Sequence, residues 1–272
     1  MSPPRHWPGS WLTGVAVAVG LVGCATVPAP APQVVQRPSI ARTCTAAPRG
    51  SVTAHHLHSS ATKQTERFQI YRPPGTTTGD PLRLLVLLHG ATADDTQWLD
   101  VGIASAADCM AERGESDQTL IVLVDGSSVE RDHTGSPAPM EQLVIDEILP
   151  EVHRLYPNLQ GWSGTAIGGI SLGGRWALQI AAHHPDLFEA AGGHSPTISL
   201  SATELESLVD SDVRIWLDAG QSDGLQRGIR TAYDRVQAAG GGAMVMQWSG
   251  QHDRRYWSQH TEDYLRFYNQ TW

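Results

Sequence analysis

Short hydrophobic runs alternate with amphipathic stretches along most of this chain. The run at residues 82–88 is almost entirely apolar, which is typical of a strand buried on both faces of a parallel sheet. The runs at 120–124 and 165–170 share this character, whereas residues 140–155 carry apolar side chains at helical spacing and stop before Pro157. This alternation predicts an α/β fold, with a mostly parallel sheet covered by helices on both faces.

The other predicted elements extend this alternation from residue 51 to the C-terminus, without an internal repeat. We therefore predict one domain, the catalytic domain, over residues 51–272. Its remaining predicted strands are residues 52–58, 67–72, 188–192, 213–218 and 243–248. Its remaining predicted helices are a stretch ending near Arg113 and residues 172–183, 224–239 and 254–269.

The N-terminal segment has a different pattern. A weakly basic start at Arg5 precedes an apolar run at 11–22, which is too short to span a bilayer and fits a secretory signal peptide. The run ends in Leu-Val-Gly-Cys at 21–24, which resembles the lipobox of bacterial lipoproteins. That resemblance implies removal of residues 1–23 and acylation of Cys24 with a lipid such as palmitate. The alternative is an ordinary signal peptide with an incidental cysteine, and both interpretations predict export.

Residues 24–50 are interpreted as a tether. Four prolines lie among Ala, Val and Gln between positions 27 and 38, a composition that favours extended chain. We therefore expect an exported domain of the bacterial cell envelope that is held at a membrane by its lipid anchor. In such an oxidising compartment Cys44 and Cys109 either form a disulfide or remain two thiols, and the sequence leaves both options open.

Composition excludes several classes of function. The formal net charge of −9 argues against a general nucleic-acid-binding surface. The chain contains no phosphate-binding loop and no dinucleotide fingerprint, so we expect no cofactor. His56 and His58 share one face of a predicted strand but have no further ligands nearby, so we expect no metal site.

The most informative segment surrounds Ser171. Gly169, Ser171 and Gly173 form a G-x-S-x-G motif between a predicted strand and a predicted helix, which is the context of a nucleophile elbow. The glycines serve a tight turn in which neighbouring side chains would collide. Such a turn exposes the serine hydroxyl at a helix N-terminus, where the Leu172 N–H can stabilise an oxyanion.

A serine hydroxyl needs a base and an orienting carboxylate to become a nucleophile. In this type of fold they follow in the order serine, acid, histidine. Asp223 lies in a loop after the strand at 213–218 and is the preferred acid. Its rival, Asp218, sits at the strand end and is expected to fix the loop by hydrogen bonding. His252 lies in the loop after the last predicted strand and is the preferred base.

The other histidines after Ser171 receive structural interpretations. His183 and His184 close a helix before a proline and are expected to be capping or surface residues. His260 lies within the final helix and is expected to face solvent. His194 precedes the acid in the chain, which breaks the required order, and is expected to line the pocket.

Three segments besides the elbow support a family resemblance. They are His-Pro-Asp-Leu-Phe at 184–188, Leu-Asp-Ala-Gly at 217–220 leading to Asp223, and Gly-Gln-His-Asp at 250–253 followed by Tyr256 and Trp257. Together they resemble the "putative esterase" group of α/β-hydrolases, which includes esterase D-like enzymes, enterochelin and feruloyl esterases, and secreted mycolyltransferases. The resemblance covers residues from about 51 to the C-terminus. It implies an α/β-hydrolase fold with Ser171, Asp223 and His252 as the triad.

The resemblance also places a second oxyanion donor in the loop at residues 89–98. His-Gly at 89–90 matches the family pattern and points to the Ala91 N–H. Asp94, Asp95 and Trp98 are then expected to border the substrate cleft. The two carboxylates are equally compatible with capping of the following helix. Trp98, Trp248 and Trp257 lie near the expected site loops and suit a carbohydrate or aromatic acyl group, although core packing explains tryptophans equally well.

These observations predict a serine esterase, a carboxylic-ester hydrolase that acts through an acyl-serine intermediate. Its expected substrate is an extracytoplasmic ester, either a small molecule or linked to a polysaccharide. One alternative is an acyltransferase with the same triad, because motifs do not decide whether water or an alcohol resolves the acyl-enzyme. Another alternative, which the complete set of triad residues disfavours, is a non-catalytic lipoprotein that binds envelope glycans.

Overall fold

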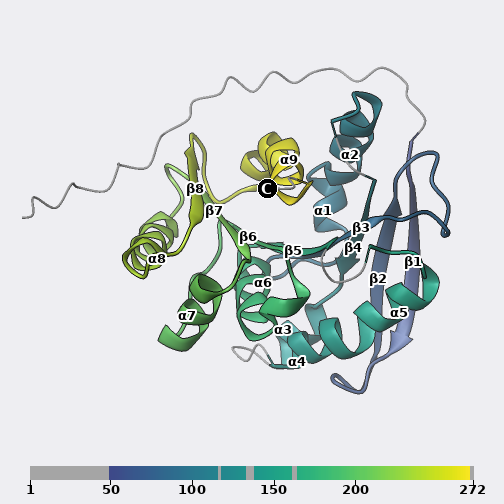
Figure 1. Cartoon of the computed structure of the whole chain (residues 1–272), viewed down its shortest axis with the longest axis horizontal. Coiled ribbons are helices and arrows are strands. Elements are labelled where there is room, and N and C mark those ends of the chain that lie inside the picture. Colours follow the sequence, from purple (N-terminus) through teal and green to yellow (C-terminus); the bar gives the residue numbers. More distant parts are fainter. Residues whose placement is uncertain (1–48, 116–117, 133–137, 161–163, 270–272) are drawn as a thin grey trace, which may run out of the picture. The chain divides into compact units, whose positions relative to one another are not determined.

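The computed structural model describes residues 49–115, 118–132, 138–160 and 164–269, in which an eight-stranded sheet lies between two layers of helices (Figure 1). The sheet order is β1-β2-β4-β3-β5-β6-β7-β8. β2 pairs antiparallel with β1 and β4, and all other neighbours are parallel. The strands are β1 (Ser51–His58), β2 (Thr65–Arg72), β3 (Arg83–Leu88), β4 (Thr119–Val124), β5 (Thr165–Ile170), β6 (Ala190–His194), β7 (Arg214–Gly220) and β8 (Ala243–Trp248).

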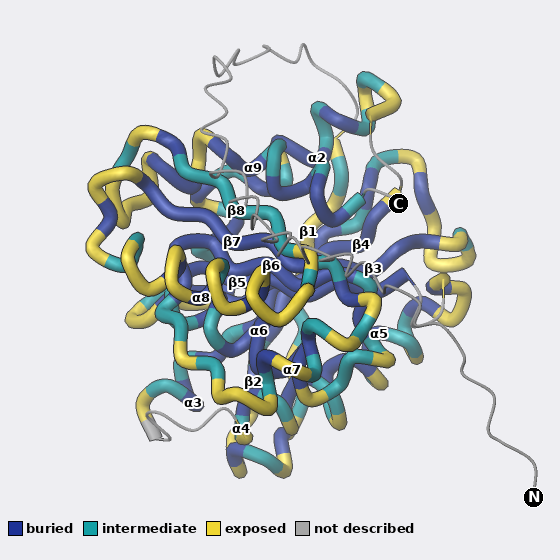
Figure 2. Tube along the Cα trace, turned by 60° about the vertical axis from the view of Figure 1, so that its left-hand side comes forward, coloured by how far each residue is buried: buried dark blue, intermediate teal, exposed yellow. Residues whose placement is uncertain are grey.

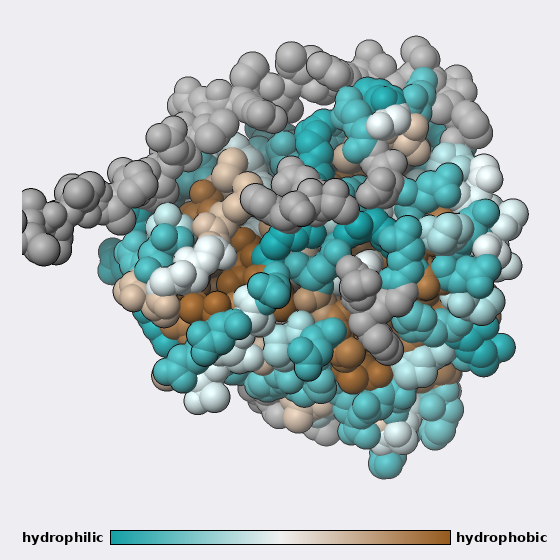
Figure 3. Space-filling model, in the orientation of Figure 1, coloured by the Kyte–Doolittle hydropathy of each residue, from teal (hydrophilic) through white to brown (hydrophobic). Residues whose placement is uncertain are grey.

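The central strands are apolar because both of their faces are covered. In β3, Leu84, Val86 and Leu88 pack into one hydrophobic cluster, whereas Leu85 and Leu87 pack into the cluster on the opposite face. The middle of the sheet is accordingly buried along its length (Figure 2). The two edge strands are less covered: β1 is largely exposed, and β8 is partly exposed over most of its residues, with hydrophobic surface visible there in Figure 3.

Two helical layers cover the sheet (Figure 1). One layer contains α1 (Gln97–Asp100), α2 (Ile103–Glu112) and α9 (Arg254–Asn269). The other contains α3 (Ser127–Asp132), α4 (Ala138–Gln142), α5 (Leu149–Leu155), α6 (Leu172–His183), α7 (Ala202–Asp210) and α8 (Gln226–Ala238). This is the predicted architecture of a mostly parallel sheet with helices on both faces.

The helix predicted over residues 140–155 is divided into three parts. A π-helical segment, Leu143–Ile148, separates α4 from α5. Pro150 stands in the first turn of α5. Because proline has no N–H and its ring collides with the carbonyl four residues earlier, the regular α-helical ladder cannot continue through this point.

Two helices, α3 and α7, are not predicted from the sequence. The strand predicted at residues 188–192 begins two residues later, as β6. α7 begins with a capping box, in which the Ser201 hydroxyl accepts from the Glu204 N–H and the Glu204 carboxylate accepts from the Ser201 N–H. The shift of β6 is more important for the site. It puts His194 at the last position of the strand, where its carbonyl accepts a hydrogen bond from the Ser171 N–H at 2.9 Å.

The predicted signal peptide at 1–23, the predicted lipidation site Cys24, and Cys44 all lie outside the described residues, as does nearly all of the tether. Cys109, on α2, is disulfide-bonded. Within the described ranges, no helix is long and apolar enough to cross a membrane. The same part of the chain contains no cluster of three or more His, Cys, Asp or Glu side chains suited to hold a metal ion.

Candidate active site

Ser171 lies at the sharp turn between β5 and α6. Its backbone has φ 53° and ψ −111°, a left-handed conformation that few residues other than glycine adopt. Three backbone hydrogen bonds hold this turn: the Ser171 N–H donates to the His194 carbonyl, and the N–H groups of Arg175 and Thr197 both donate to the Ser171 carbonyl at 3.2 Å. The strained turn lifts the serine side chain out of the sheet at its C-terminal edge.

The elbow glycines allow three backbone segments to meet. A Cβ atom at Gly169 would lie 2.2 Å from the carbonyl carbon of Gly173. A Cβ atom at Gly173 would lie 2.4 Å from the carbonyl oxygen of His89, at the end of β3. These contacts are with backbone atoms that cannot move aside, so both positions require glycine for the close approach.

The structure brings Ser171, Asp223 and His252 together from three separate loops. His252 Nε2 lies 3.1 Å from Ser171 Oγ, and His252 Nδ1 lies 3.0 Å from Asp223 Oδ2. Asp223 is buried, and its second oxygen accepts a hydrogen bond from the Leu225 N–H at 2.8 Å. The geometry therefore suits a neutral imidazole that donates to Asp223 and accepts from the serine hydroxyl.

The two predicted oxyanion donors flank the serine. Leu172 is the first residue of α6, so its N–H has no partner within the helix. On the other side, a Cβ atom at Gly90 would lie 3.3 Å from Ser171 Cβ, which places the 89–91 loop directly against the nucleophile. Nucleophile, base, acid and candidate donors thus occupy one site at the C-terminal edge of the sheet.

Comparison with known protein families identifies the family of this chain. Residues 59–268, well over half of the chain, match the family model described as "Putative esterase". The chain belongs to this family. The protein is therefore an esterase. Membership of this family supports the predicted class of enzyme, a carboxylic-ester hydrolase.

Solved structures show the same fold. A ferulic acid esterase superposes with a TM-score of 0.73 at 19% identity, covering 81% of this chain and 98% of that one. The enterobactin esterase of Shigella flexneri gives a TM-score of 0.68 at 23% identity, covering 82% and 59%. The S-formylglutathione hydrolase of Staphylococcus aureus gives 0.67 at 16% identity, covering 81% and 99%. The predicted α/β-hydrolase fold is confirmed.

A relative by sequence is an uncharacterized protein of Corynebacterium glutamicum, 26% identical over 159 residues. The matched region is 52% of this esterase and 36% of that protein, so the two correspond over only part of their lengths.

A cavity of about 290 Å³ lies between the loop before α1 and the start of α9, and Trp257 separates it from His252 of the triad. Trp257 forms one wall, and its ring packs edge-on against His252 with ring centroids 5.2 Å apart. Its indole N–H donates to the Ser195 hydroxyl at 3.3 Å. Trp257 therefore borders the cavity, as expected. Gln97 also lines the cavity, whereas Ser195 is buried behind Trp257, and no pattern in the sequence indicates either of them.

Asp94 borders the cavity, as expected, but it does not cap α1, whose N-cap residue is Thr96. It lines the same cavity, and its carboxylate accepts from the N–H and the hydroxyl of Thr96 at 2.8 and 2.6 Å. These hydrogen bonds lower the pKa of Asp94 and keep it ionised. The carboxylate thus shapes the turn into α1 and adds negative charge to the cavity.

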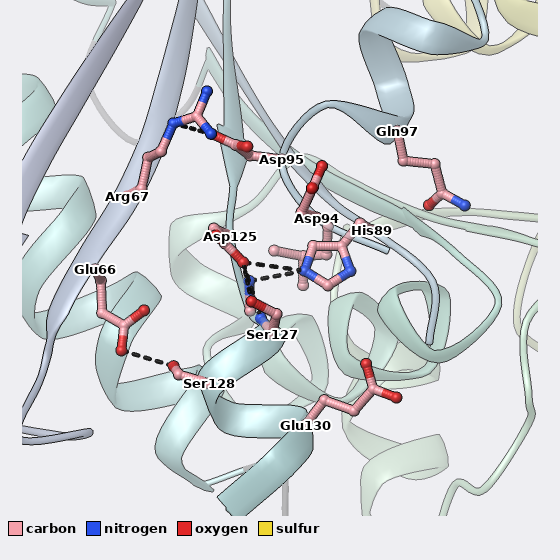
Figure 4. Close-up of polar contacts among 12 residues, drawn as sticks. Glu66, Arg67, His89, Asp94, Asp95, Gln97, Asp125, Ser127, Ser128 and Glu130 are labelled. Carbon is pink, nitrogen blue, oxygen red and sulfur yellow. Dashed lines mark hydrogen bonds and ion pairs between the residues drawn. The ribbon is translucent and has the colours of Figure 1, made fainter. Parts of the chain in front are cut away.

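Asp95 and Trp98 do not lie at the cleft, in contrast to the expectation. The Trp98 side chain is 0% exposed and donates its indole N–H to the Leu88 carbonyl at 3.0 Å, because the first turn of α1 directs it into the core. Asp95 is 1% exposed and forms an ion pair with Arg67 at 3.3 Å (Figure 4). Burial raises the pKa of Asp95. Both side chains therefore stabilise the loop at residues 89–98 from its buried side.

The expected positions of two histidines are also wrong. His194 does not line the pocket but is fully buried, with Nδ1 2.8 Å from Asp218 Oδ1 and Nε2 2.8 Å from the Tyr268 hydroxyl. His260 does not face solvent but stacks on Trp248, with ring centroids 3.9 Å apart. Asp218 is a hydrogen-bonding residue, as expected, although it anchors a buried network rather than a loop.

His183 and His184 both contact the carboxylate of Glu141, on α4. His183 Nδ1 lies 2.7 Å from Glu141 Oε2, and His184 Nε2 lies 2.8 Å from Oε1. They are partly exposed, which agrees with a surface location, and they link the end of α6 to α4. His184 is also the C-cap residue of α6, and its N–H donates to the Ile180 carbonyl at 3.0 Å.

Asp125, which lies close to His89 near this site, makes a pH-dependent contribution to the stability of the esterase. Burial raises the pKa of this carboxyl, but the hydrogen bonds from the hydroxyl and the N–H of Ser127 outweigh burial and lower it (Figure 4). A folded-state pKa below the unfolded value means that the charged form stabilises the fold above pH 4. That contribution disappears as the pH falls below 4.

We therefore expect Asp125→Asn to destabilise the esterase at pH 6 and to make little difference at pH 2. Urea unfolding of both proteins at several pH values would measure this. A constant difference between them from pH 6 to pH 2 would contradict the role of the charge.

Proposed function

We propose that this protein is an exported serine esterase that hydrolyses carboxylic esters through an acyl-serine intermediate. The observation that carries the proposal is the continuous chain of contacts from Ser171 Oγ to His252 Nε2 and from His252 Nδ1 to Asp223, at 3.1 and 3.0 Å. Such a chain activates a serine hydroxyl for acyl transfer.

In the first half of the reaction, Ser171 Oγ attacks the ester carbonyl carbon while His252 Nε2 accepts the hydroxyl proton. The carbonyl oxygen becomes an oxyanion and accepts hydrogen bonds from the N–H groups of Leu172 and Ala91. A single donor of this kind typically lowers the barrier by about 2.7–4 kcal/mol. The bond from the carbonyl carbon to the alcohol oxygen then breaks, and His252 returns the proton to the leaving alcohol.

In the second half, water replaces the alcohol. His252 removes a proton from the water as it attacks the acyl group on Ser171, and the same imidazole protonates Ser171 Oγ as the acid leaves. Asp223 holds the imidazole ring in place and stabilises its charged form in both halves. The buried position of Asp223 strengthens this interaction, because little water screens it.

The cavity beside the triad supports a small acyl or alcohol group as the part of the substrate that is bound. Its volume of about 290 Å³, with Trp257 on one side and polar side chains around it, suits a compact group with an apolar face. Two proteins that share this fold are described as a ferulic acid esterase and an enterobactin esterase. We infer an ester substrate of comparable kind, free or attached to a polysaccharide.

Two observations support export. The pattern of residues 1–24 is that of a lipoprotein signal, and Cys109 is disulfide-bonded, which is typical of proteins in oxidising compartments. We propose that Cys24 carries a lipid that holds the esterase at a membrane of the cell envelope.

A fluorophosphonate probe tests the catalytic proposal directly. We expect the probe to add covalently to Ser171, and mass spectrometry of the digested protein should find the adduct on the peptide that contains this residue. Prior incubation with a phenyl-substituted phosphonate ester inhibitor should block the labelling. Ester hydrolysis that persists after complete incubation with the probe, with no adduct at Ser171, would overturn the proposal.

A further inference from the structure

The loop at residues 89–93, which carries the Ala91 N–H, is held by side chains from two helices that contribute no residue to the triad. We propose that Gln97 of α1 and Glu130 of α3 are positioning residues that aim the Ala91 N–H at the substrate oxyanion. This proposal rests on the acyl-serine function above and extends it to two side chains that act through the backbone amides of the loop.

Four consecutive residues, 90–93, present their amides around the site, and three of these amides already have protein acceptors. The Gly90 N–H donates to Gln97 Oε1 at 2.7 Å, the Thr92 N–H donates to Glu130 Oε2 at 2.8 Å, and the Ala93 N–H donates to the Gly90 carbonyl at 3.2 Å. Within the described part of the chain, the Ala91 N–H alone among the four donates to no protein acceptor. It is therefore the amide available to a ligand.

The direction of this N–H follows from the peptide unit to which it belongs. The carbonyl of Gly90 and the N–H of Ala91 share one trans peptide plane, so they point in opposite directions. His89 Nδ1 lies 2.8 Å from this carbonyl, so the Ala91 N–H points away from the His89 ring, and His89 Nε2 accepts from the Gly126 N–H at 2.8 Å. Because Gly90 lies against Ser171, the Ala91 N–H emerges beside the nucleophile.

The loop does not hold this shape through local preference. Thr92 has φ 62°, a left-handed conformation that is unfavourable for a β-branched residue and persists only when the surroundings impose it. Gln97 and Glu130 supply these surroundings. In Figure 4 they lie on opposite sides of His89, Gln97 from α1 above and Glu130 from α3 below.

Such an arrangement affects the transition state more than the substrate complex. The oxyanion forms only as Ser171 attacks, so loss of orientation at Ala91 lowers kcat and leaves KM nearly unchanged. The same loss weakens inhibitors that form a tetrahedral oxyanion adduct with the serine. A purely structural role for the two side chains would instead lower thermal stability or the fraction of active protein.

Glu130 allows a matched pair of variants. Glu130→Met and Glu130→Gln both remove the negative charge, but only glutamine keeps an oxygen that accepts from the Thr92 N–H. Gln97→Met removes the acceptor for the Gly90 N–H from the other helix. Gln237→Met, at an exposed position of α8, is the control for the same chemical change.

We would measure kcat and KM for p-nitrophenyl acetate, the inhibition constant of an alkyl trifluoromethyl ketone, and the melting temperature. Fluorophosphonate titration normalises each kcat to active protein. We expect Glu130→Met and Gln97→Met to lower kcat by about tenfold to a hundredfold, less than complete loss of an oxyanion donor, and to raise the inhibition constant by the same factor. Glu130→Gln and Gln237→Met should retain the kcat of the unmodified protein.

Unchanged kcat and inhibition constant in both methionine variants would overturn the proposal, as would a fall in kcat without a rise in the inhibition constant. A fall in Glu130→Gln equal to that in Glu130→Met would also overturn it for Glu130. The proposed function fails separately, if Ser171→Ala retains turnover. Because the two methionine variants change different helices, misfolding of one leaves the other to decide.

Discussion

Ser171→Ala is expected to lower kcat for short p-nitrophenyl esters by about a million-fold, since a serine protease that loses one key member of its triad loses activity on this scale. The alanine keeps the Cβ atom and every backbone hydrogen bond of the elbow. The free energy of unfolding should therefore change by less than about 0.5 kcal/mol. Initial rates with p-nitrophenyl acetate and urea unfolding of the same preparation would measure both effects.

His252→Ala provides a stricter form of this prediction. Residues that act as one unit have non-additive effects, so Ser171→Ala/His252→Ala should be no slower than Ser171→Ala alone. Ser258→Ala, at an exposed position of α9, controls for the removal of a serine hydroxyl and should retain full activity. Substantial turnover by Ser171→Ala would show that the nucleophile lies elsewhere.

Asp218→Ala is expected to have the largest effect on stability, about 3–5 kcal/mol. The Asp218 carboxylate is fully buried and accepts four hydrogen bonds from side chains. The donors are His194 Nδ1 and Trp216 Nε1 on one oxygen, each at 2.8 Å, and the hydroxyls of Tyr256 and Tyr264 on the other, at 2.8 and 3.2 Å. Alanine would leave all four donors buried without an acceptor.

The tyrosines of this network remain donors over a wide pH range. Burial, together with the charge of Asp218, raises the pKa of Tyr256 and Tyr264 far above the usual value. Urea unfolding of Asp218→Ala at neutral pH would measure the loss, and Asp212→Ala at an exposed position is the matched control. A midpoint equal to that of the unmodified protein would show that the network contributes little to stability.

Much of the architecture follows from the sequence because burial leaves a clear pattern. The strands β3, β4 and β5 lie between two helical layers, and their residues are accordingly almost all apolar. The elbow is equally visible, since close backbone contacts require Gly169 and Gly173 around Ser171. The order of serine, acid and histidine along the chain then restricts the candidates for the other two triad positions.

Side-chain direction is less visible in the sequence, especially beside a loop. Whether Trp98 faces the cleft or the core depends on where the four-residue helix α1 begins, and such a short helix has no hydrophobic period of its own. The burial of His260 does have a periodic signal, since it follows Tyr256 and precedes Tyr264 at intervals of four residues on one helix face. The capping box at Ser201 similarly marks the start of α7.

The exposure of the triad has a consequence for the fate of the acyl-enzyme. The His252 side chain is 35% exposed, and the adjoining cavity is open. An acyl group on Ser171 would therefore meet bulk solvent, in which water far outnumbers any alcohol. Transfer to an alcohol requires a bound acceptor that displaces this water. We accordingly expect partitioning between the two acceptors to favour release of the free acid, so that the geometry favours a hydrolase over an acyltransferase.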